Sequence, residues 1–347
     1  MTVPRTMLTP GHEISRLIRG GWQLAGDHGP VDVAGLNQGF LDFFDAGITT
    51  LDCADIYTGV EALIGNFRAS LLQQRGAEAL ARLKVHTKFV PDLALLGQLR
   101  FADVEAIIDR SRTRLGMDRL DLVQFHWGDY AQPGAMDAVQ HLAALQRDGR
   151  IAHVAGTNFD ASHLDAFAGA GVPLASIQVQ YSLLDRRPAG AFTATAARHG
   201  TGIIAYGTLA GGFLSDRWLG VADPAGSLSN RSLIKYRLII DECGGWDAFQ
   251  ALLAVLAGIA KRHGVPLSAV AARWVLDQPG VSAIIIGARN ATQLADTLAI
   301  TRLALDAADH AAIAAVLPPG PQGEVYALER DRHGPHGRIM KYNLNKG

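Results

Sequence analysis

The amino-acid sequence predicts an α/β fold of one particular kind, a (β/α)8 TIM barrel in a single domain. Short apolar runs alternate with longer stretches of helical periodicity along nearly the whole chain, which is the pattern of strand and helix units that build a parallel sheet. Eight such units are expected, and eight is the number that closes a barrel of this type. A doubly wound open sheet is the alternative with the same local pattern.

The alternating runs define the expected elements in chain order. Strands are expected at residues 17–22, 49–52, 85–89, 120–126, 151–157, 175–179, 202–206 and 281–286. Helices are expected at 31–46, 60–73, 101–115, 136–148, 162–170, 188–199, 245–262, 266–277 and 291–300. The helix at 101–115 illustrates the evidence, because Val104, Ile107 and Ile108 share one face and Gly116 ends the periodic pattern. With 347 residues, 48% of them hydrophobic, and no internal repeat, one domain over 1–347 with a barrel at about 17–316 is the simplest interpretation.

Two segments fall outside this alternation. Residues 207–244 form a stretch rich in glycine, serine, asparagine and charged residues, far longer than an ordinary barrel loop. Long insertions at strand ends commonly act as lids over a site. The tail at 317–347 begins with Pro318, Pro319 and Pro321, and two possibilities remain open for it: it lies over the pocket, or it is loosely attached.

Composition excludes several classes of function. The 32 basic and 33 acidic residues give a formal net charge of −1, so the sequence predicts no basic surface for nucleic acid and no polybasic membrane anchor. Two cysteines, and no apolar run of the length of a signal peptide or a membrane span, lead us to expect a soluble cytoplasmic protein without disulfides. None of the 12 histidines forms a His-x-His or His-x-x-x-His pair, so no metal site is expected.

Four polar residues stand at or just after the ends of the second, third and fourth expected strands, where parallel barrels place their chemistry. They are Asp52, Tyr57, Lys88 and His126. A buried lysine needs a nearby anion, which Asp52 can supply, and the lysine cation would then lower the pKa of Tyr57 from about 10. Tyr57 could exchange a proton while His126 donates a hydrogen bond to a substrate carbonyl. This set suits proton transfer coupled to hydride transfer from a cofactor, which is carbonyl reduction.

Each of these residues also has an ordinary structural explanation. An aspartate at a strand end often caps the next helix, a lysine within a strand often occupies a sheet edge, and a histidine can be satisfied by a backbone carbonyl. Their occurrence at the ends of three consecutive strands favours a shared site. Trp22, Trp127 and Trp218 have two explanations as well, an apolar wall of a substrate pocket or packing in the core.

At these positions the sequence resembles the aldo-keto reductase superfamily. The matching motifs are the run from Asp52 to Tyr57, the His-Thr-Lys that ends at Lys88, and the Phe-His-Trp that contains His126. The resemblance extends from about residue 18 to residue 300. It implies a (β/α)8 barrel that binds NADP(H) without a Rossmann fold, and a catalytic tetrad made of Asp52, Tyr57, Lys88 and His126.

The same resemblance implies a set of cofactor-binding residues at the mouth of the barrel. On the nicotinamide side these are Gly21, Trp22, Asp52, Thr157, Asn158, Gln178 and Tyr206, with Tyr206 stacked on the ring. Along the pyrophosphate they are Gly207, Thr208, Leu209, Gly211 and Arg231, and around the adenosine they are Gly287, Arg289, Gln293 and Asp296. Because a guanidinium fork fits phosphate geometry, Arg289 is the residue expected to bind a 2′-phosphate.

The resemblance therefore implies an NADPH-dependent reductase of aldehydes or ketones, with a small-molecule carbonyl or alcohol as substrate and Tyr57 as general acid. Two alternatives remain open: an NADP-dependent dehydrogenase of a sugar or alcohol, and a nucleotide-binding regulatory subunit on the same barrel. A metal-dependent hydrolase is disfavoured because the end of the first strand, from Gly20 to Gln23, contains no His-x-His. The sequence makes no prediction of the oligomeric state.

Overall fold

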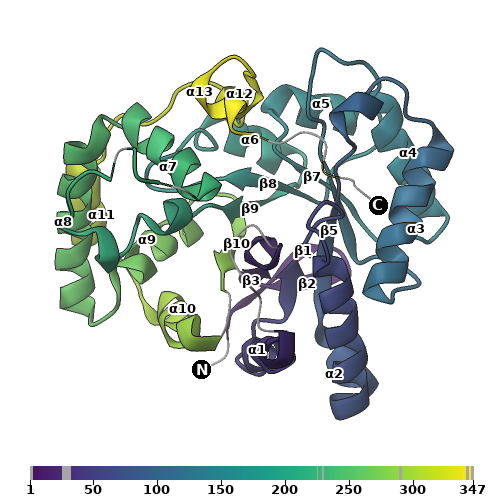
Figure 1. Ribbon diagram of the computed structural model, residues 1–347, viewed down its shortest axis with the longest axis horizontal. Coiled ribbons are helices and arrows are strands. Elements are labelled where there is room, and N and C mark those ends of the chain that lie inside the picture. The colour runs from purple at the N-terminus through teal and green to yellow at the C-terminus, as the bar shows by residue number, and fades with distance from the viewer. Residues whose placement is uncertain are drawn as a thin grey trace.

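Eight parallel strands close into a barrel in the computed structural model of the chain, which describes residues 3–25, 33–224, 226–228, 230–288, 291–340 and 344 (Figure 1). The barrel strands are β3 (Leu17–Gly20), β4 (Thr50–Asp52), β5 (Lys84–Phe89), β6 (Leu122–Phe125), β7 (Val154–Thr157), β8 (Ser176–Gln180), β9 (Gly202–Tyr206) and β10 (Val281–Gly287). They follow one another around the ring in chain order, and β10 pairs with both β9 and β3 to close it. The predicted (β/α)8 fold is confirmed, and every expected strand is present close to its expected place.

Helices surround the barrel and follow each strand. Their bounds are α1 (Val33–Asp45), α2 (Val60–Arg82), α3 (Phe101–Leu115), α4 (Ala135–Arg147), α5 (Ala161–Gly169), α6 (Ala191–Arg198), α7 (Arg231–Glu242), α8 (Gly245–His263), α9 (Leu267–Leu276), α10 (Leu294–Arg302), α11 (Ala307–Val316), α12 (Ala327–Arg330) and α13 (Pro335–Arg338). The segment α2 is longer than the expected 60–73, since a second helical stretch follows the break at Gly76, whose φ is 81°. Among the described helices none is alone long and apolar enough to cross a membrane, and α7 with α8, bent by 94°, meets that length and composition test only as a pair.

Several elements were not predicted from the sequence. An antiparallel hairpin, β1 (Arg5–Thr9) and β2 (His12–Ser15), precedes the barrel. Short 3-10 helices η1 (Trp22–Leu24) and η2 (Leu93–Leu95) follow β3 and β5, and η5 (Ala291–Gln293) replaces the first turn of the helix expected from residue 291. The long segment 207–244 contains η3 (Ala210–Gly212), η4 (Asp216–Trp218) and α7, so it is a helical insertion and not an irregular loop.

The interior of the barrel is lined by apolar residues and a buried histidine pair at one end, and by polar and charged residues at the other. The hairpin residues Leu8 and Ile14 pack against Ile18, Leu122 and other inward-facing strand residues, so the hairpin closes the end at which the strands begin. Toward the opposite end, the inward-facing side chains become an aspartate, two glutamines and a lysine, all described below. Because successive side chains of a strand alternate between its two faces, the remaining strand residues point outward and form the larger core beneath the helices.

The tail folds back over the mouth of the barrel. In Figure 1 α12 and α13, drawn in yellow, lie beside α7. Glu329 of α12 is buried and pairs with Arg187, which follows β8, at 3.1 Å, while His336 of α13 lies 3.4 Å from Glu242 of α7. Of the two possibilities left open for the tail, the structure therefore shows the first, in which the tail covers the pocket.

Candidate active site

The four candidate catalytic residues meet at the mouth of the barrel. Asp52 ends β4, Lys88 is the next-to-last residue of β5, His126 follows β6, and Tyr57 lies in the turn between β4 and α2. The Lys88 ammonium donates to Asp52 Oδ1 at 2.7 Å and to the backbone carbonyl of Cys53 at 2.9 Å. It also lies 5.2 Å from the centre of the Tyr57 ring. Lys88 is only 5% exposed, so the ammonium is held inside the site and does not point into bulk water.

Two glutamines complete the surroundings of the Asp52 carboxylate. Its second oxygen, Oδ2, accepts hydrogen bonds from the side-chain amides of Gln124 at 2.8 Å and Gln178 at 2.7 Å. Gln178 also donates to Gln124 Oε1 at 2.7 Å. Both carboxylate oxygens are therefore satisfied, which is the condition under which a buried ion pair avoids an uncompensated desolvation cost.

Burial sets the protonation state of the tyrosine. It raises the pKa of Tyr57 above its ordinary value, and the opposing effect of the Lys88 charge is smaller. The sequence-based expectation that Lys88 would lower this pKa is therefore wrong for the net shift, although the sign of the lysine's own contribution is as expected. The same two effects act on the pKa of Lys88, but with the opposite outcome. Burial lowers this pKa, the negative charges of Asp52 and Tyr57 raise it by more, and the net shift is upward. At neutral pH the pair is a phenol beside an ammonium, which is the proton-donating form.

His126 faces a backbone carbonyl on one side and the tail on the other. Its Nδ1 lies 3.2 Å from the carbonyl oxygen of Thr157, an oxygen that can only accept, so Nδ1 carries the proton. Burial lowers the pKa of the ring to about 4. A neutral ring with its proton on Nδ1 presents a lone pair at Nε2, and this corrects the expectation that His126 donates to a substrate carbonyl at neutral pH. On its other side the ring meets Tyr326 of the tail edge-on, with ring centres 5.7 Å apart.

The residues expected around the nicotinamide lie together at the ends of β7, β8 and β9. The hydroxyl of Thr157 and the backbone N–H of Asn158 both donate to the carbonyl of Gln178, at 3.1 and 2.9 Å. The Tyr206 hydroxyl donates to Asn158 Oδ1 at 3.0 Å. Gln178 itself turns its amide nitrogen inward to Asp52, so in this structure it holds the Asp52 carboxylate.

Trp22 and Gly21 extend this region to the end of β3. The Trp22 ring packs edge-on against Tyr57 with centres 5.0 Å apart, and the Gly21 N–H donates to the Asp52 carbonyl at 2.7 Å. The guanidinium of Arg231, at the start of α7, lies 5.5 Å from the centre of the Trp22 ring. The start of α7, within the long insertion, therefore lies beside the end of β3 at the mouth of the barrel.

The expected pyrophosphate loop adopts a glycine-dependent conformation. Gly207, Gly211 and Gly212 have φ values of 69°, 67° and 100°, which favour glycine strongly. A Cβ built on Gly211 would approach Tyr236 of α7 to 2.7 Å, whereas one on Gly212 would meet nothing within 4 Å. Thr208 is buried beside them, and Leu209 is partly buried. The loop is thus packed against α7 on one side and open at Gly212 on the other.

The expected adenosine residues that the structure describes belong to the end of β10, to η5 and to the start of α10. Gly287 ends β10 against Gln23, because a Cβ there would come within 2.7 Å of the Gln23 amide nitrogen. Gln293 ends η5, and Asp296 is in the first turn of α10; both are exposed. Arg289 lies outside the described residues, so its expected contact with a 2′-phosphate stays a prediction from the sequence.

Two tryptophans expected as possible pocket walls belong to the core. Trp127 is 1% exposed and donates from its ring nitrogen to the Gln132 carbonyl at 3.1 Å. Trp218 packs on Phe213 with ring centres 4.7 Å apart. Of the three tryptophans, Trp22 alone lies against a tetrad residue in the described part of the chain.

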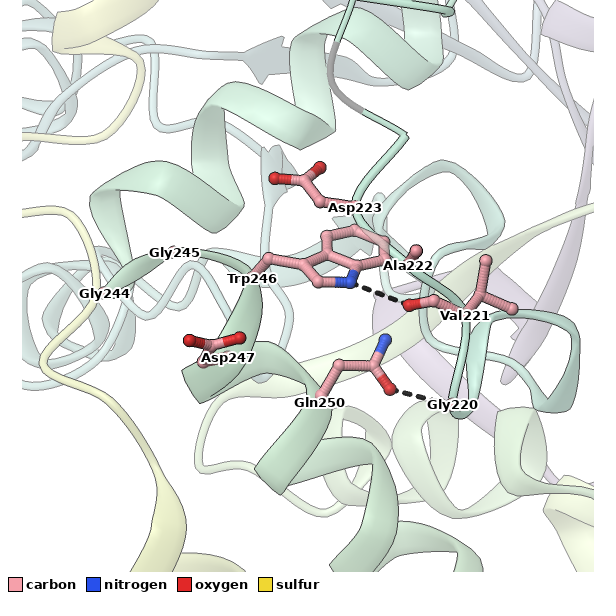
Figure 2. A pocket seen from close by; sticks show the side chains of 9 residues that line it. All are labelled: Gly220, Val221, Ala222, Asp223, Gly244, Gly245, Trp246, Asp247 and Gln250. Atoms are coloured by element: carbon pink, nitrogen blue, oxygen red, sulfur yellow. Dashed lines mark hydrogen bonds between the residues drawn. The ribbon is translucent and has the colours of Figure 1, made fainter.

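One surface hollow lies away from the candidate site. A depression of about 800 Å³ lies between the 220–223 segment and the start of α8, where Trp246 donates to the Val221 carbonyl and Gln250 accepts from the Gly220 N–H (Figure 2). None of the tetrad residues lines it. Beside His126 the space measures only about 30 Å³, because the mouth is covered by neighbouring loops and by Leu344 of the tail. The position of the site therefore follows from the tetrad and not from cavity size.

Sequence reasoning missed several residues around the site. Gln124 carried a usable signal, since it is a polar residue at an inward-facing position between Leu122 and His126 on the fourth strand. Tyr326, Glu329 and Arg330 carried none, because they belong to a segment without strong periodicity and the residues they contact lie far away in the chain, 142 residues for Arg187 and 172 for Asn158.

The chain is similar to curated proteins of several organisms. It is 26% identical to the aldo-keto reductase YhdN of Bacillus subtilis over 90% of this chain and 94% of that protein. It is 24% identical to an NADH-specific methylglyoxal reductase of Escherichia coli over 85% and 92%. It is 29% identical to flagellar radial spoke protein 5 of Chlamydomonas reinhardtii over 72% of this chain, which spans only 58% of that protein.

Comparison with solved structures and with family models agrees with this geometry. A glycerol dehydrogenase of Gluconobacter oxydans has the same fold, with a TM-score of 0.75 at 23% identity over 90% of this chain and 95% of that one. The model of the aldo/keto reductase family matches residues 16–318, which include every strand of the barrel and all four residues of the tetrad. The chain therefore belongs to the aldo/keto reductase family.

Proposed function

We propose that this oxidoreductase reduces an aldehyde or ketone to the alcohol with NADPH, and that Tyr57 is the proton donor. The observation that carries the proposal is the buried Lys88–Asp52 pair, 2.7 Å across, beneath the ring of Tyr57. Taken one at a time, Asp52, Lys88 and His126 could each have a purely structural role. A charge pair held this tightly against a phenol at the end of barrel strands has a ready explanation in proton transfer.

Tyr57 performs the proton step from its neutral form. Its raised pKa keeps the phenol protonated at working pH, so a proton is available for the oxygen of a carbonyl that is being reduced. Lys88 then stands 5.2 Å from the ring and stabilises the phenolate that remains. Bound NADPH would supply the hydride.

The residues at the mouth fit a nicotinamide dinucleotide. Asn158 and Tyr206 offer an amide and an aromatic ring next to the tetrad, and the left-handed glycines at 207, 211 and 212 give the backbone of the next loop the freedom to approach phosphate oxygens. Gly21, Trp22, Thr157 and Gln178 would frame the nicotinamide end, and Arg231 with Thr208 and Leu209 would frame the phosphates. Gly287, Arg289, Gln293 and Asp296 would hold the adenosine, with Arg289 selecting NADPH over NADH.

Oxidation of an alcohol or sugar is the second candidate, and the geometry of His126 favours it. Because Nδ1 is committed to the Thr157 carbonyl, the free Nε2 accepts a hydrogen bond, and a substrate hydroxyl can donate one. The glycerol dehydrogenase of Gluconobacter oxydans shares this fold. In this direction Tyr57 would need to be deprotonated first, and its raised pKa makes that step costly at neutral pH.

The proposal is tested by following NADPH absorbance with 4-nitrobenzaldehyde and by the variant Tyr57→Phe. We expect reduction to fall by roughly a hundredfold or more, since a positioned proton donor contributes that much, while NADPH fluorescence reports nearly unchanged binding. Tyr181→Phe is the matched control, because its ring packs against Trp274 in the core. Equal turnover in wild type and Tyr57→Phe would assign the proton to another group. NADPH binding without turnover of any carbonyl would instead favour a regulatory subunit.

A further inference from the structure

Asn158 occupies an unusual backbone conformation directly after β7. Its φ is 63°, in the left-handed region that asparagine tolerates better than most residues but that still costs energy relative to the ordinary regions. In this conformation its side-chain oxygen meets the Tyr206 hydroxyl and its backbone N–H meets the Gln178 carbonyl. Its own backbone carbonyl then points away from the barrel, toward the tail.

Arg330, the last residue of α12, binds that carbonyl. Its Nη1 donates to the Asn158 carbonyl at 3.1 Å and to the Tyr130 hydroxyl at 3.1 Å. The Tyr130 hydroxyl lies 3.4 Å from the same Asn158 carbonyl, to which it also donates. A residue from the end of the chain thus satisfies the polar group that the left-handed turn exposes.

The guanidinium is itself fixed from several sides. Its carbon lies 4.1 Å from the centre of the Tyr130 ring, its Nη2 donates to the Val325 carbonyl at 3.2 Å, and the Asp160 carboxylate lies 3.7 Å away. The side chain is 14% exposed. A planar fork with several donors can bridge the tail and the turn after β7 at once, which a lysine with a single ammonium cannot do.

We propose that Arg330 is a positioning residue for the nicotinamide end of the cofactor and that it acts through Asn158. By holding the Asn158 carbonyl, Arg330 keeps this residue in the left-handed turn that presents its amide beside Tyr206. The inference rests on the proposed function, because it requires that Asn158 contacts the nicotinamide carboxamide. It adds a contribution from the tail to a site whose other residues come from the barrel.

The tail does not depend on Arg330 alone for its attachment. The preceding residue, Glu329, is held independently by Nη1 and Nη2 of Arg187, at 3.1 and 3.2 Å. Removal of the Arg330 side chain therefore leaves the tail anchored and releases the Asn158 turn. This separation makes the positioning role distinguishable from a general loosening of the tail.

The test compares two ligands that differ only in the nicotinamide ring. Dissociation constants of wild type, Arg330→Ala and Arg330→Lys are measured by calorimetry for NADPH and for 2′-phospho-ADP-ribose, which lacks the ring. We expect Arg330→Ala to bind NADPH about tenfold more weakly, as the loss of a charged hydrogen bond implies, and to bind the ring-free ligand as wild type does. Arg330→Lys should fall between the two. Arg338→Ala is the matched control, because Arg338 is an exposed arginine of the same tail.

Each outcome decides the matter. A selective loss for NADPH supports the positioning role. Equal losses for both ligands would show that Arg330 stabilises the mouth in general, and unchanged NADPH binding would show that Asn158 holds its turn without it; both overturn the inference and leave the proposed function intact. A wild-type protein that binds neither ligand would overturn the proposed function together with the inference.

Discussion

Lys88 keeps its charge inside the barrel because its ammonium has two hydrogen-bond acceptors, one of them a carboxylate. Asp52 and the Cys53 carbonyl accept its hydrogen bonds, and Gln124 and Gln178 hold the carboxylate from the other side. Removal of one partner from such a buried pair typically costs about 3–5 kcal/mol, since it leaves the other charge unpaired. The ion pair that stabilises the two charges also holds the Lys88 cation beside the Tyr57 phenol. The same contact therefore serves both the stability of the barrel and the proposed proton transfer.

The histidine of the tetrad predicts a pH dependence. With Nδ1 committed to Thr157, His126 can donate to a carbonyl only when it is doubly protonated, and its pKa is lowered to about 4. The protonated fraction therefore grows as the pH falls. We expect kcat/KM for reduction to rise by up to about tenfold per pH unit between about pH 8 and pH 5, with the rise lost in His126→Gln. Parallel profiles for the two proteins would mean that the ring does not polarise the substrate in either form.

The hairpin β1–β2 brings a buried histidine pair into the closed end of the barrel. His12 Nε2 lies 2.9 Å from His86 Nε2, and the His153 ring lies 5.0 Å from that of His12. Burial first, and then the neighbouring charges of His86, His153 and Lys84, lower the pKa of His12 from 6.5 to about 2. Burial first, and then Lys88 and His153, lower the pKa of His86 to about 3. Both imidazole rings are therefore neutral in the folded protein at neutral pH.

This pair makes the hairpin end of the barrel sensitive to acid. Below pH 6.5 the unfolded chain binds protons that the folded chain does not, so the stability present above that pH is lost as the pH falls toward about 3. The slope is about 1.4 kcal/mol per pH unit for each proton taken up. We expect the urea midpoint of wild type to fall between about pH 7 and pH 5, and the double variant His12→Gln with His86→Gln to show a shallower fall.

The slope of the urea midpoint against pH is compared between the proteins, and not the midpoint itself, because the substitutions change packing as well as charge. His333→Gln, at an exposed position of the tail, should leave the wild-type slope unchanged. A double variant with the full wild-type slope would show that other groups cause the loss of stability in acid.

At the scale of the whole molecule, the tail and the long insertion pack against each other over the mouth of the barrel. Glu329 is almost fully buried, pairs with Arg187, and lies 3.7 Å from the Lys235 ammonium of α7. Lys235 also lies 5.3 Å from the centre of the Tyr206 ring. Burial lowers the pKa of Lys235, with Glu329 opposing that shift. One carboxylate from the tail therefore compensates cations from two other parts of the chain beside the expected nicotinamide site.

Loss of this carboxylate should release the tail. We expect Glu329→Gln to lower the free energy of unfolding by about 3–5 kcal/mol, since it removes the carboxylate that pairs with the buried Lys235 ammonium, while Arg187 keeps only Asp185 as its anion, and to make the 317–326 segment much more susceptible to limited proteolysis. Glu324→Gln, the same substitution at an exposed position of the same tail, should change neither measurement. Identical cleavage rates for the two variants would show that Glu329 does not hold the tail.

The order of elements was predictable because its signals are local. Apolar runs such as 85–89 and 120–126 predict buried strands from their own residues. The ends of the strands carry Asp52, Lys88 and His126 within a few positions of recognisable motifs. The hairpin, α7 and the tail helices were not predictable in this way. The strands of the hairpin are short, and the insertion and the tail have mixed composition, so their structure depends on the surfaces against which they pack.

The sequence by itself determined the alternation of strands and helices and the presence of an aspartate, a tyrosine, a lysine and a histidine at successive strand ends, because spacing along the chain specifies both. The tertiary structure alone decided that the pKa of Tyr57 rises, that His126 donates a hydrogen bond from Nδ1 to the Thr157 carbonyl, and that Arg330 reaches Asn158. These depend on burial and on contacts between residues far apart in the chain, and both come into existence only when the barrel closes and the tail packs over its mouth.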